Sequence, residues 1–452
     1  MKSAVTLVYP YILPDGDNSI FRFPPLGLGY IAAYLKANDV GAEIIDCTFL
    51  SQGKALERIR NAGSKIIGIY SMFSMTEKAK DLARLVRDDC ELLVAGGPQP
   101  TLNPTEFLRY FDVVVIGEGE QTMLELQRAV EGKGDLSGIR GIAYRDGSCI
   151  KYTEKRKPVT ELDDIPMPSR ELFDNNGYKE HYKKKFGYTI TSLMTSRGCP
   201  FKCDFCSQPV FGNTFRARSA KNIVDEMQSI IALGYDRIWF ADDCLTLNRG
   251  RILEICREIT ERGMEIEWEC LSRVDTVDRE VVENMKRAGC VSIFFGIESG
   301  NDSVLELMNK SITTAKAREA IHAVKQANIR AGAFFIIGYP GESDETVLDT
   351  VRFATSLPLD YLSFTLPYPI PGTPLYERVK DDVILAGWEE HASKSMLRHK
   401  LLFRSRFSET KLKFAIVKAM AQHKLRRQFG ERVEIIVKPL GFITDVVFRL
   451  MR

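Results

Sequence analysis

Three cysteines, Cys199, Cys203 and Cys206, follow one another in a CxxxCxxC spacing. Closely spaced thiols in one loop can wrap a cubane iron–sulfur cluster, which takes thiolate ligands. A structural zinc site normally needs four protein ligands, and the nearest histidine, His181, lies 18 residues upstream of Cys199. Three ligands leave one iron of a cubane open, and an open iron can bind a substrate or a cofactor. The triplet therefore predicts a [4Fe–4S] cluster with a catalytic role.

The elements around the triplet alternate between strand and helix. Short apolar runs predict six strands, at residues 190–195, 237–240, 265–270, 292–295, 332–337 and 361–366. Amphipathic segments between them predict helices at 221–233, 249–262, 279–288, 314–327 and 344–356. Six such βα units in series predict a partial parallel (β/α)6 barrel, whose chemistry lies at the carboxyl ends of its strands.

The first part of the chain has the same alternation. Strands are predicted at residues 5–9, 43–46, 66–70, 92–95 and 113–116, which indicates a doubly wound, Rossmann-like sheet. Sheets of this kind bind ligands beyond the carboxyl ends of their strands. The residues expected at that edge are Tyr9, Ser71, Met72, Phe73, Ser74, Gly96, Gly97, Gln99, Thr101, Gly117, Glu118, Gly119 and Glu120. Loops of this composition suit a large flat or nucleotide-like ligand, although turns alone would also explain the glycines.

Length and composition bound the remaining choices. A chain of 452 residues suggests two or three domains. We place an α/β domain at residues 1–144, a linker or docking segment at 145–188, the partial barrel at 189–375 and a basic, mainly helical region at 376–452. The net charge of +2 argues against nucleic acid as a partner. No apolar run reaches the ~18 residues that a membrane span needs, and no signal peptide is evident, so we expect a cytoplasmic protein.

The cysteine triplet resembles the signature of radical S-adenosylmethionine (SAM) enzymes, and the resemblance extends over residues 185–375. It implies that Phe205 lies against the adenine, that Asp242 and Asp243 meet the methionine amino group, and that Ser272 and Arg273 hold hydroxyl and carboxylate groups of SAM. Glu298 would contact the ribose, and Gly338 would pack on the adenine. In such an enzyme the open iron chelates SAM, and an electron from the cluster cleaves SAM to a 5′-deoxyadenosyl radical.

The loops of the first domain resemble the cobalamin-binding half of B12-dependent radical SAM proteins. The edge residues named above would then bind cobalamin. Residues 1–180 contain no histidine, so this domain cannot ligate cobalt from below in the manner of the methionine-synthase type. Gln99 stands where many relatives carry histidine. A weak lower ligand favours homolytic delivery of a methyl radical from methylcobalamin.

The resemblance implies a C-methyltransferase that uses two molecules of SAM. One would remethylate cobalamin and leave as S-adenosylhomocysteine, and the other would generate the radical that activates an sp3 carbon. A ring-forming or rearranging enzyme of tetrapyrrole, hopanoid or lipid metabolism shares this architecture, and only methylation consumes SAM to S-adenosylhomocysteine. A degenerate sensor of B12 or SAM would be non-catalytic, and the complete triplet argues against it.

Substrate and partners are less constrained. The segment from Tyr9 to Pro24 is similar to the methanogen enzyme that methylates a glutamine α-carbon in methyl-coenzyme M reductase. A ferredoxin or flavodoxin would supply electrons to what we expect to be a monomer. Residues 394–452 hold 15 Lys and Arg against 4 Asp and Glu, a net charge of +11. This basic region could guide an acidic protein substrate, while an apolar stripe in Gly441–Arg452 could contact a membrane or dock on the barrel.

Overall fold

The computed structural model describes residues 4–12, 22–132, 134–206, 211–384, 400–430 and 434–451. The chain forms two compact units, which we describe separately. The N-terminal unit comprises residues 1–199 and 207–238, and the C-terminal unit comprises residues 200–206 and 239–452. Asp17–Phe21, part of the segment that resembles the methanogen enzyme, lies outside the described residues, as does Arg452.

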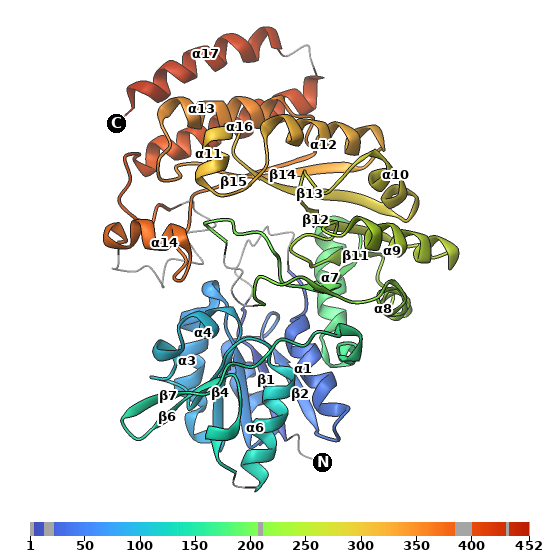
Figure 1. Cartoon of the computed structure of the whole chain (residues 1–452), viewed down its shortest axis with the longest axis vertical. Helices are drawn as coiled ribbons and strands as arrows, with labels where there is room; N and C mark the ends of the chain where they lie inside the picture. The colour runs from blue at the N-terminus through green and yellow to red at the C-terminus, as the bar shows by residue number, and fades with distance from the viewer. Residues whose placement is uncertain are drawn as a thin grey trace. The chain divides into compact units, whose positions relative to one another are not determined.

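Strands and helices alternate through most of the N-terminal unit (Figure 1). Its first sheet contains β1 (Val5–Tyr9), β2 (Ala42–Asp46), β3 (Ile66–Tyr70), β4 (Leu92–Gly96), β5 (Val113–Val115), β6 (Ile142–Asp146) and β7 (Cys149–Tyr152). The helices that connect these strands are α1 (Leu26–Lys36), α2 (Gln52–Ala62), α3 (Thr76–Val86), α4 (Pro98–Leu102), α5 (Pro104–Phe107) and α6 (Glu120–Gly132). Short 3-10 turns follow several of the strands and helices, at Phe73–Met75, Arg87–Asp89, Leu136–Gly138, Leu162–Asp164 and Arg170–Leu172.

The strand order of this sheet is β2-β1-β3-β4-β5-β6-β7. The first five strands pair in parallel, and β6 and β7 add an antiparallel edge. The order reverses between β1 and β3, because the chain passes from β1 outward to β2 and then returns to the other side of β1. In open α/β sheets such a switch point, at the carboxyl ends of the strands, is where ligands bind.

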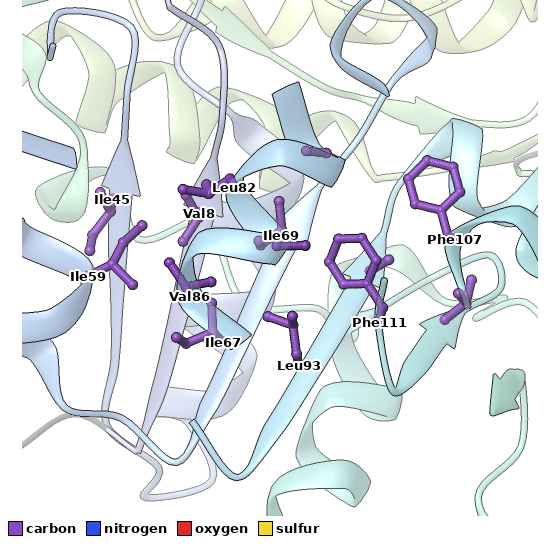
Figure 2. Close-up of a cluster of buried hydrophobic side chains, with 14 of the residues drawn as sticks. Val8, Ile45, Ile59, Ile67, Ile69, Leu82, Val86, Leu93, Phe107 and Phe111 are labelled. Atoms are coloured by element: carbon purple, nitrogen blue, oxygen red, sulfur yellow. The ribbon is translucent and has the colours of Figure 1, made fainter. Parts of the chain in front are cut away.

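Hydrophobic cores cover both faces of the parallel strands. Ile67, Ile69 and Leu93 contribute to one core, which Figure 2 shows packed against helix residues such as Leu82. The alternate positions, including Val94, contribute to the core on the opposite face. Because successive strand residues point to opposite faces, the nearly continuous apolar runs seen in the sequence are those of a sheet buried on both sides.

The segment predicted to be a linker, residues 145–188, contains β7 and α7 (Asn175–Phe186). The N-terminal unit continues through β8 (Ile190–Leu193), β9 (Ser196–Arg197), β10 (Arg216–Ala217) and α8 (Ala220–Ala232). Glu226 of α8 is fully buried and accepts hydrogen bonds from Arg170 and Arg218. These contacts join the expected linker to the elements that follow it. The boundaries at residues 144 and 188 remain a proposal.

The second sheet has the strand order β15-β14-β13-β12-β11-β8. Its strands after β8 are β11 (Arg237–Phe240), β12 (Glu267–Ser272), β13 (Cys290–Glu298), β14 (Arg330–Ile336) and β15 (Tyr361–Thr365). Within the C-terminal unit, β12 to β15 pair in parallel. The connecting helices are α9 (Arg249–Glu261), α10 (Arg279–Arg287), α11 (Asp302–Leu307), α12 (Thr314–Gln326) and α13 (Asp344–Ser356).

The described part of the basic region after the sheet is mainly helical, with a non-helical segment at residues 400–408. It contains α14 (Pro374–Val379), a 3-10 turn at Lys380–Asp382, α16 (Glu409–Phe429) and α17 (Glu434–Leu450). Helix α16 packs on α13, and α17 packs on both of these helices (Figure 1). Within the described part of the chain, no helix is both long enough and apolar enough to span a bilayer.

Candidate functional site

A glycine with a left-handed backbone immediately precedes the cysteine triplet. Gly198 has φ of +81°, and a Cβ at this position would lie 2.3 Å from the carbonyl oxygen of Thr214. Any L side chain would therefore be strained and would also clash with backbone. Cys199, which follows directly, is buried in the N-terminal unit. The turn that carries Cys199 thus depends on glycine.

Backbone hydrogen bonds hold the second half of the cysteine loop in the C-terminal unit. The Asp204 N–H donates to the Met308 carbonyl at 3.0 Å, and the Asp204 carbonyl accepts from Leu375 N–H at 3.0 Å. Cys203 and Cys206, on either side of Asp204, are half-buried and form no disulfide. No three His, Cys, Asp or Glu side chains of the described residues converge on one point. The donor set nevertheless fits a [4Fe–4S] cluster, because its ligands are thiolates and none of the three cysteines is in a disulfide.

Glu298 and Lys310 form a buried ion pair beside Phe205. Lys310 Nζ lies 3.3 Å from Glu298 Oε1 and 5.8 Å from the centre of the Phe205 ring. Glu298 ends β13 with φ of +74°, directly after a shift in the β13–β14 register. A bulge of this kind re-aims a side chain, and a non-glycine residue with positive φ persists only where the surrounding structure holds it.

The structure places the other predicted SAM contacts of the C-terminal unit at the ends of its strands. Ser272 ends β12, and its hydroxyl shares a hydrogen-bond network with Thr246 and Thr276. The guanidinium of Arg273, the next residue, lies 3.6 Å from the Phe201 ring centre and donates to the Lys310 carbonyl at 2.9 Å. Of the two aspartates predicted to contact SAM after β11, Asp242 is buried and Asp243 is exposed.

After β14, Gly338 has φ of +83°, and its N–H and that of Tyr339 donate to Glu342 Oε2 at 2.7 and 2.8 Å. Glu342 is fully buried, and its other oxygen, Oε1, has no hydrogen-bond partner. Burial raises the pKa of Glu342 to about 8, although the two N–H donors oppose that shift. The geometry adds two groups that the sequence-based site residues did not include, Lys310 and Glu342.

Aromatic rings and glycines line the carboxyl edge of the N-terminal sheet at its switch point. The Tyr9 and Tyr70 rings, at the ends of β1 and β3, lie 5.5 Å apart, and burial raises the pKa of both hydroxyls. Gly97 has φ of +107°, and a Cβ there would lie 2.6 Å from the Ser71 carbonyl oxygen. A Cβ on Gly96 would meet no heavy atom within 4 Å. This edge therefore has one glycine that the backbone requires and one that faces open space.

Hydrogen bonds connect the loops of this edge to one another. Ser71 N–H donates to the Gly96 carbonyl at 2.8 Å, Gln99 N–H donates to the Ser71 carbonyl at 3.2 Å, and Gly117 N–H donates to Thr101 Oγ1 at 3.1 Å. Met72 is exposed, and Phe73 and Ser74 are half-buried in the turn after β3. The open space at Gly96 and the tyrosine rings beside it fit a large ligand such as cobalamin.

The carboxylates of Glu118 and Glu120 form ion pairs inside the N-terminal unit. Glu120 Oε1 lies 2.5 Å from Arg197 Nη2, and Glu118 Oε1 lies 2.6 Å from Arg216 Nη2. Val159 N–H also donates to Glu118 at 3.1 Å. Both carboxylates are therefore engaged within the unit, and their role in cofactor binding remains a prediction.

Comparison with known proteins identifies the same two halves. A B12 binding domain matches residues 16–127, and the radical SAM superfamily matches residues 193–354. An uncharacterized methyltransferase of Pyrococcus horikoshii is 33% identical over 401 residues, which span 84% of this chain and 85% of that protein. The anaerobic magnesium-protoporphyrin IX monomethyl ester cyclase of Cereibacter sphaeroides is 28% identical over 395 residues, 84% of this chain and 64% of that protein.

Solved structures share the fold. The cobalamin-dependent S-adenosylmethionine radical enzyme OxsB, with aqua-cobalamin bound, matches with a TM-score of 0.76 and 18% identity over 98% of this chain and 72% of that one. The radical SAM methyltransferase TsrM of Kitasatospora setae matches with a TM-score of 0.72 and 20% identity over 83% of this chain and 76% of that one. The predicted order, a Rossmann-like domain followed by a radical SAM domain, is confirmed.

Proposed function

The chain belongs to the family of cobalamin-dependent radical SAM methyltransferases, and we propose that it transfers a methyl group to an unactivated sp3 carbon. The cofactors of this family are a [4Fe–4S] cluster, SAM and cobalamin. When bound, the cluster and SAM supply a radical that removes hydrogen from carbon, and cobalamin supplies the methyl group. The single observation that carries the proposal is the pairing of these two family matches with a complete cysteine triplet in one chain.

In the C-terminal unit, charged side chains would bind and orient SAM. Cys199, Cys203 and Cys206 would hold the cluster, and Phe205 would lie against the adenine. Glu298 would accept from the ribose hydroxyls, and its ion pair with Lys310 at 3.3 Å supports this role because the pair holds the carboxylate in one orientation. Ser272, Arg273, Asp242, Asp243 and Gly338 would complete the SAM site.

In the N-terminal unit, the loops after β1, β3, β4 and β5 would bind cobalamin without a histidine ligand. The first 180 residues contain no histidine. Within the described part of this unit, His181 is the one histidine, and its ring packs against Phe49 and Tyr182 at centroid distances of 6.0 and 5.7 Å. The Tyr9, Ser71, Gly96, Gly97 and Gln99 region would contact the cofactor instead.

The substrate that we propose is a glutamine α-carbon in a protein, methyl-coenzyme M reductase, and the reductant is a ferredoxin or flavodoxin. The likeness of the N-terminal segment to the methanogen enzyme supports this substrate. The similarity to a tetrapyrrole cyclase over 84% of the chain favours ring formation as the second candidate reaction.

Product stoichiometry separates these reactions. The cofactor-loaded protein is incubated with reductant, SAM carrying a deuterated methyl group, and a peptide containing the target glutamine. Methylation predicts one S-adenosylhomocysteine and one 5′-deoxyadenosine for each labelled peptide. 5′-Deoxyadenosine without S-adenosylhomocysteine would contradict methylation and favour ring formation. If S-adenosylhomocysteine and 5′-deoxyadenosine both form but the peptide carries no label, methyl transfer remains the proposed function and this peptide is not its substrate.

A further inference from the structure

Helix α17 exposes a broad apolar face. Sixteen large hydrophobic side chains are exposed among the described residues, and seven of them lie on this helix of 17 residues. Ile435 is 83% exposed, Leu450 is 78% exposed and Phe442 is 68% exposed. The other members of this face, which we call the outer face of α17, are Leu440, Ile443, Val446 and Val447. Contiguous exposed apolar surface of this kind marks an interaction site.

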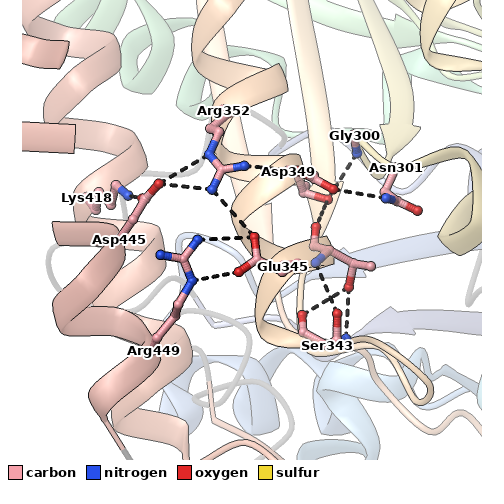
Figure 3. A network of polar contacts seen from close by, with 11 residues as sticks. Gly300, Asn301, Ser343, Glu345, Asp349, Arg352, Lys418, Asp445 and Arg449 are labelled. Carbon is pink, nitrogen blue, oxygen red and sulfur yellow. Dashed lines mark hydrogen bonds and ion pairs between the residues drawn. The ribbon is translucent and has the colours of Figure 1, made fainter. Parts of the chain in front are cut away.

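The opposite side of the helix is already packed. Phe448 is fully buried, and Val437 is 2% exposed. Asp445 forms ion pairs with Lys418 of α16 and, at 3.0 Å, with Arg352 of α13, as Figure 3 shows. Turning the outer face inward would expose Phe448 and break this buried network, which is strongly destabilising. The apolar stripe predicted in Gly441–Arg452 therefore does not dock on the barrel.

A second ion pair fixes the end of the helix. Arg449 Nε lies 2.6 Å from Glu345 Oε1, and Glu345 also forms an ion pair with Arg352 at 3.7 Å (Figure 3). The helix is therefore attached to α13 at two successive turns, through Asp445 and Arg449. Its orientation is set by contacts within the C-terminal unit, and the outer face remains directed to the surroundings.

The basic residues of this helix favour an anionic partner for the outer face. Lys438 and Arg449 are exposed on the same helix, Arg449 in its ion pair with Glu345, and none of the seven residues of the outer face is acidic. Residues 394–452 carry 15 basic and 4 acidic residues. A second copy would bring like charges together around the apolar contact, whereas a surface of anionic lipids offers both an apolar interior and negative headgroups.

We propose that α17 is an interfacial helix that attaches this protein to an anionic lipid surface, with its outer face inserted among the acyl chains and Lys438 at the headgroups. A helix in the membrane plane binds through apolar contact and attraction to anionic lipids together. The attachment is independent of the proposed methyl transfer, since none of these residues belongs to the cofactor sites.

Vesicle sedimentation tests this proposal with the full-length, cofactor-loaded chain. We expect the protein to sediment with vesicles of phosphatidylcholine and phosphatidylglycerol, and to bind about tenfold less to phosphatidylcholine alone or at high salt. Wild-type protein that stays in the supernatant with both kinds of vesicle would overturn the proposal.

Two matched triple variants separate the outer face from general surface apolarity. Phe442→Gln, Val446→Gln and Leu450→Gln together should lower the vesicle-bound fraction at least about tenfold. Leu85→Gln, Ile231→Gln and Leu307→Gln remove three exposed apolar side chains elsewhere and should leave binding unchanged. Equal binding by both variants, at unchanged thermal midpoints, would contradict the proposal. A vesicle-free self-association that only the first variant loses would instead assign the face to a second copy.

Discussion

The carboxyl edges of the two sheets differ in their chemistry. At the N-terminal edge, the Tyr9 and Tyr70 rings lie beside the glycines after β4, and the carboxylates of Asp46, Glu118 and Glu120 bind Tyr178, Arg216 and Arg197 of the same unit. At the C-terminal edge, Glu298 and Lys310 form a buried ion pair. The difference corresponds to the cofactors, because a corrin is large and mainly uncharged, whereas SAM carries an ammonium, a carboxylate and a sulfonium.

This comparison indicates how each edge achieves specificity. Shape and backbone hydrogen bonds suit a large flat ligand, and space such as that beside Gly96 matters most there. Fixed charges suit a small zwitterion, and a buried charge must be paired to be tolerated. Substitutions at the N-terminal edge should therefore lower cobalamin retention, whereas substitutions at the C-terminal edge should lower both SAM affinity and stability.

The largest effect is expected for the cysteine triplet. Replacing Cys199, Cys203 and Cys206 with alanine should remove the iron and sulfide of the cluster, together with its visible absorption, and abolish 5′-deoxyadenosine formation. Cobalamin binding should persist, because it depends on the N-terminal edge. Cys149→Ala, which removes an exposed thiol, is the matched control and should retain the cluster. A triple variant that still assembles a full cluster would refute the ligand assignment.

A large effect on stability and SAM affinity is expected for Lys310→Met. The change leaves Glu298 buried and unpaired, which typically costs about 3–5 kcal/mol. The dissociation constant for SAM should rise, and Lys310→Arg should restore part of the affinity because it keeps the charge. Binding titrations and chemical denaturation measure the two effects. Loss of stability with unchanged SAM affinity would reduce Lys310 to a structural role.

Two adjacent glycines of the N-terminal edge should affect different properties when they are substituted. Gly97→Ala forces a Cβ against the Ser71 carbonyl at φ of +107°, and we expect a loss of about 1–3 kcal/mol of stability. Gly96→Ala places its methyl group in open space, so the thermal midpoint should not change while cobalamin retention falls. Unchanged retention in Gly96→Ala would show that the cofactor does not occupy this space.

The buried Glu342 should make the stability of the protein depend on pH. Burial raises the pKa of Glu342 from 4.5 to about 8, so the folded chain binds more protons than the unfolded chain between these values. The contribution of Glu342 is full below pH 4.5 and is lost as pH rises through 8. The advantage of Glu342→Gln over wild type should therefore grow from pH 5 to pH 8, by about 1.4 kcal/mol for each pH unit well inside this window. If the free energies of unfolding of wild type and Glu342→Gln change with pH in parallel, burial does not raise the pKa of Glu342.

Local sequence patterns predicted most of the framework. Apolar runs such as 66–70 and 92–95 are strands within one residue at either end, because strands buried on both faces need continuous apolar sequence. The positions of Ser272, Glu298 and Gly338 at or just after strand ends followed from the same alternation. Their roles in binding SAM remain predictions.

Long-range pairing could not be predicted in this way. Lys310 reaches Glu298 through a loop in which Asn309 and Ser311 have positive φ, and no periodic pattern marks such a turn. Arg197 meets Glu120 across 77 residues. Amphipathic periodicity identified the stripe on α17, but the side of the helix that packs depends on partners for Phe448 and Asp445 that lie far away in the sequence.

The basic region illustrates the same limit. Its net charge predicted recruitment of an acidic partner, yet several of its cations make contacts inside the C-terminal unit. Arg426 donates to the Thr355 carbonyl at 2.7 Å, Arg427 donates to the Asp360 carbonyl at 3.1 Å, and Lys411 pairs with Asp344 at 2.9 Å. Recruitment of an acidic substrate protein remains a prediction, and variants of these arginines would also report on folding.

Electron paramagnetic resonance of the protein loaded with cob(II)alamin tests most directly whether the N-terminal edge holds cobalamin without an imidazole ligand. We expect retained cobalamin whose spectrum shows no nitrogen splitting from a protein ligand. His181→Gln should give the same spectrum, because that ring packs between Phe49 and Tyr182. Clear imidazole splitting that disappears in His181→Gln would show that a histidine ligates cobalt. Failure to retain cobalamin after anaerobic reconstitution would show that this edge does not bind the cofactor.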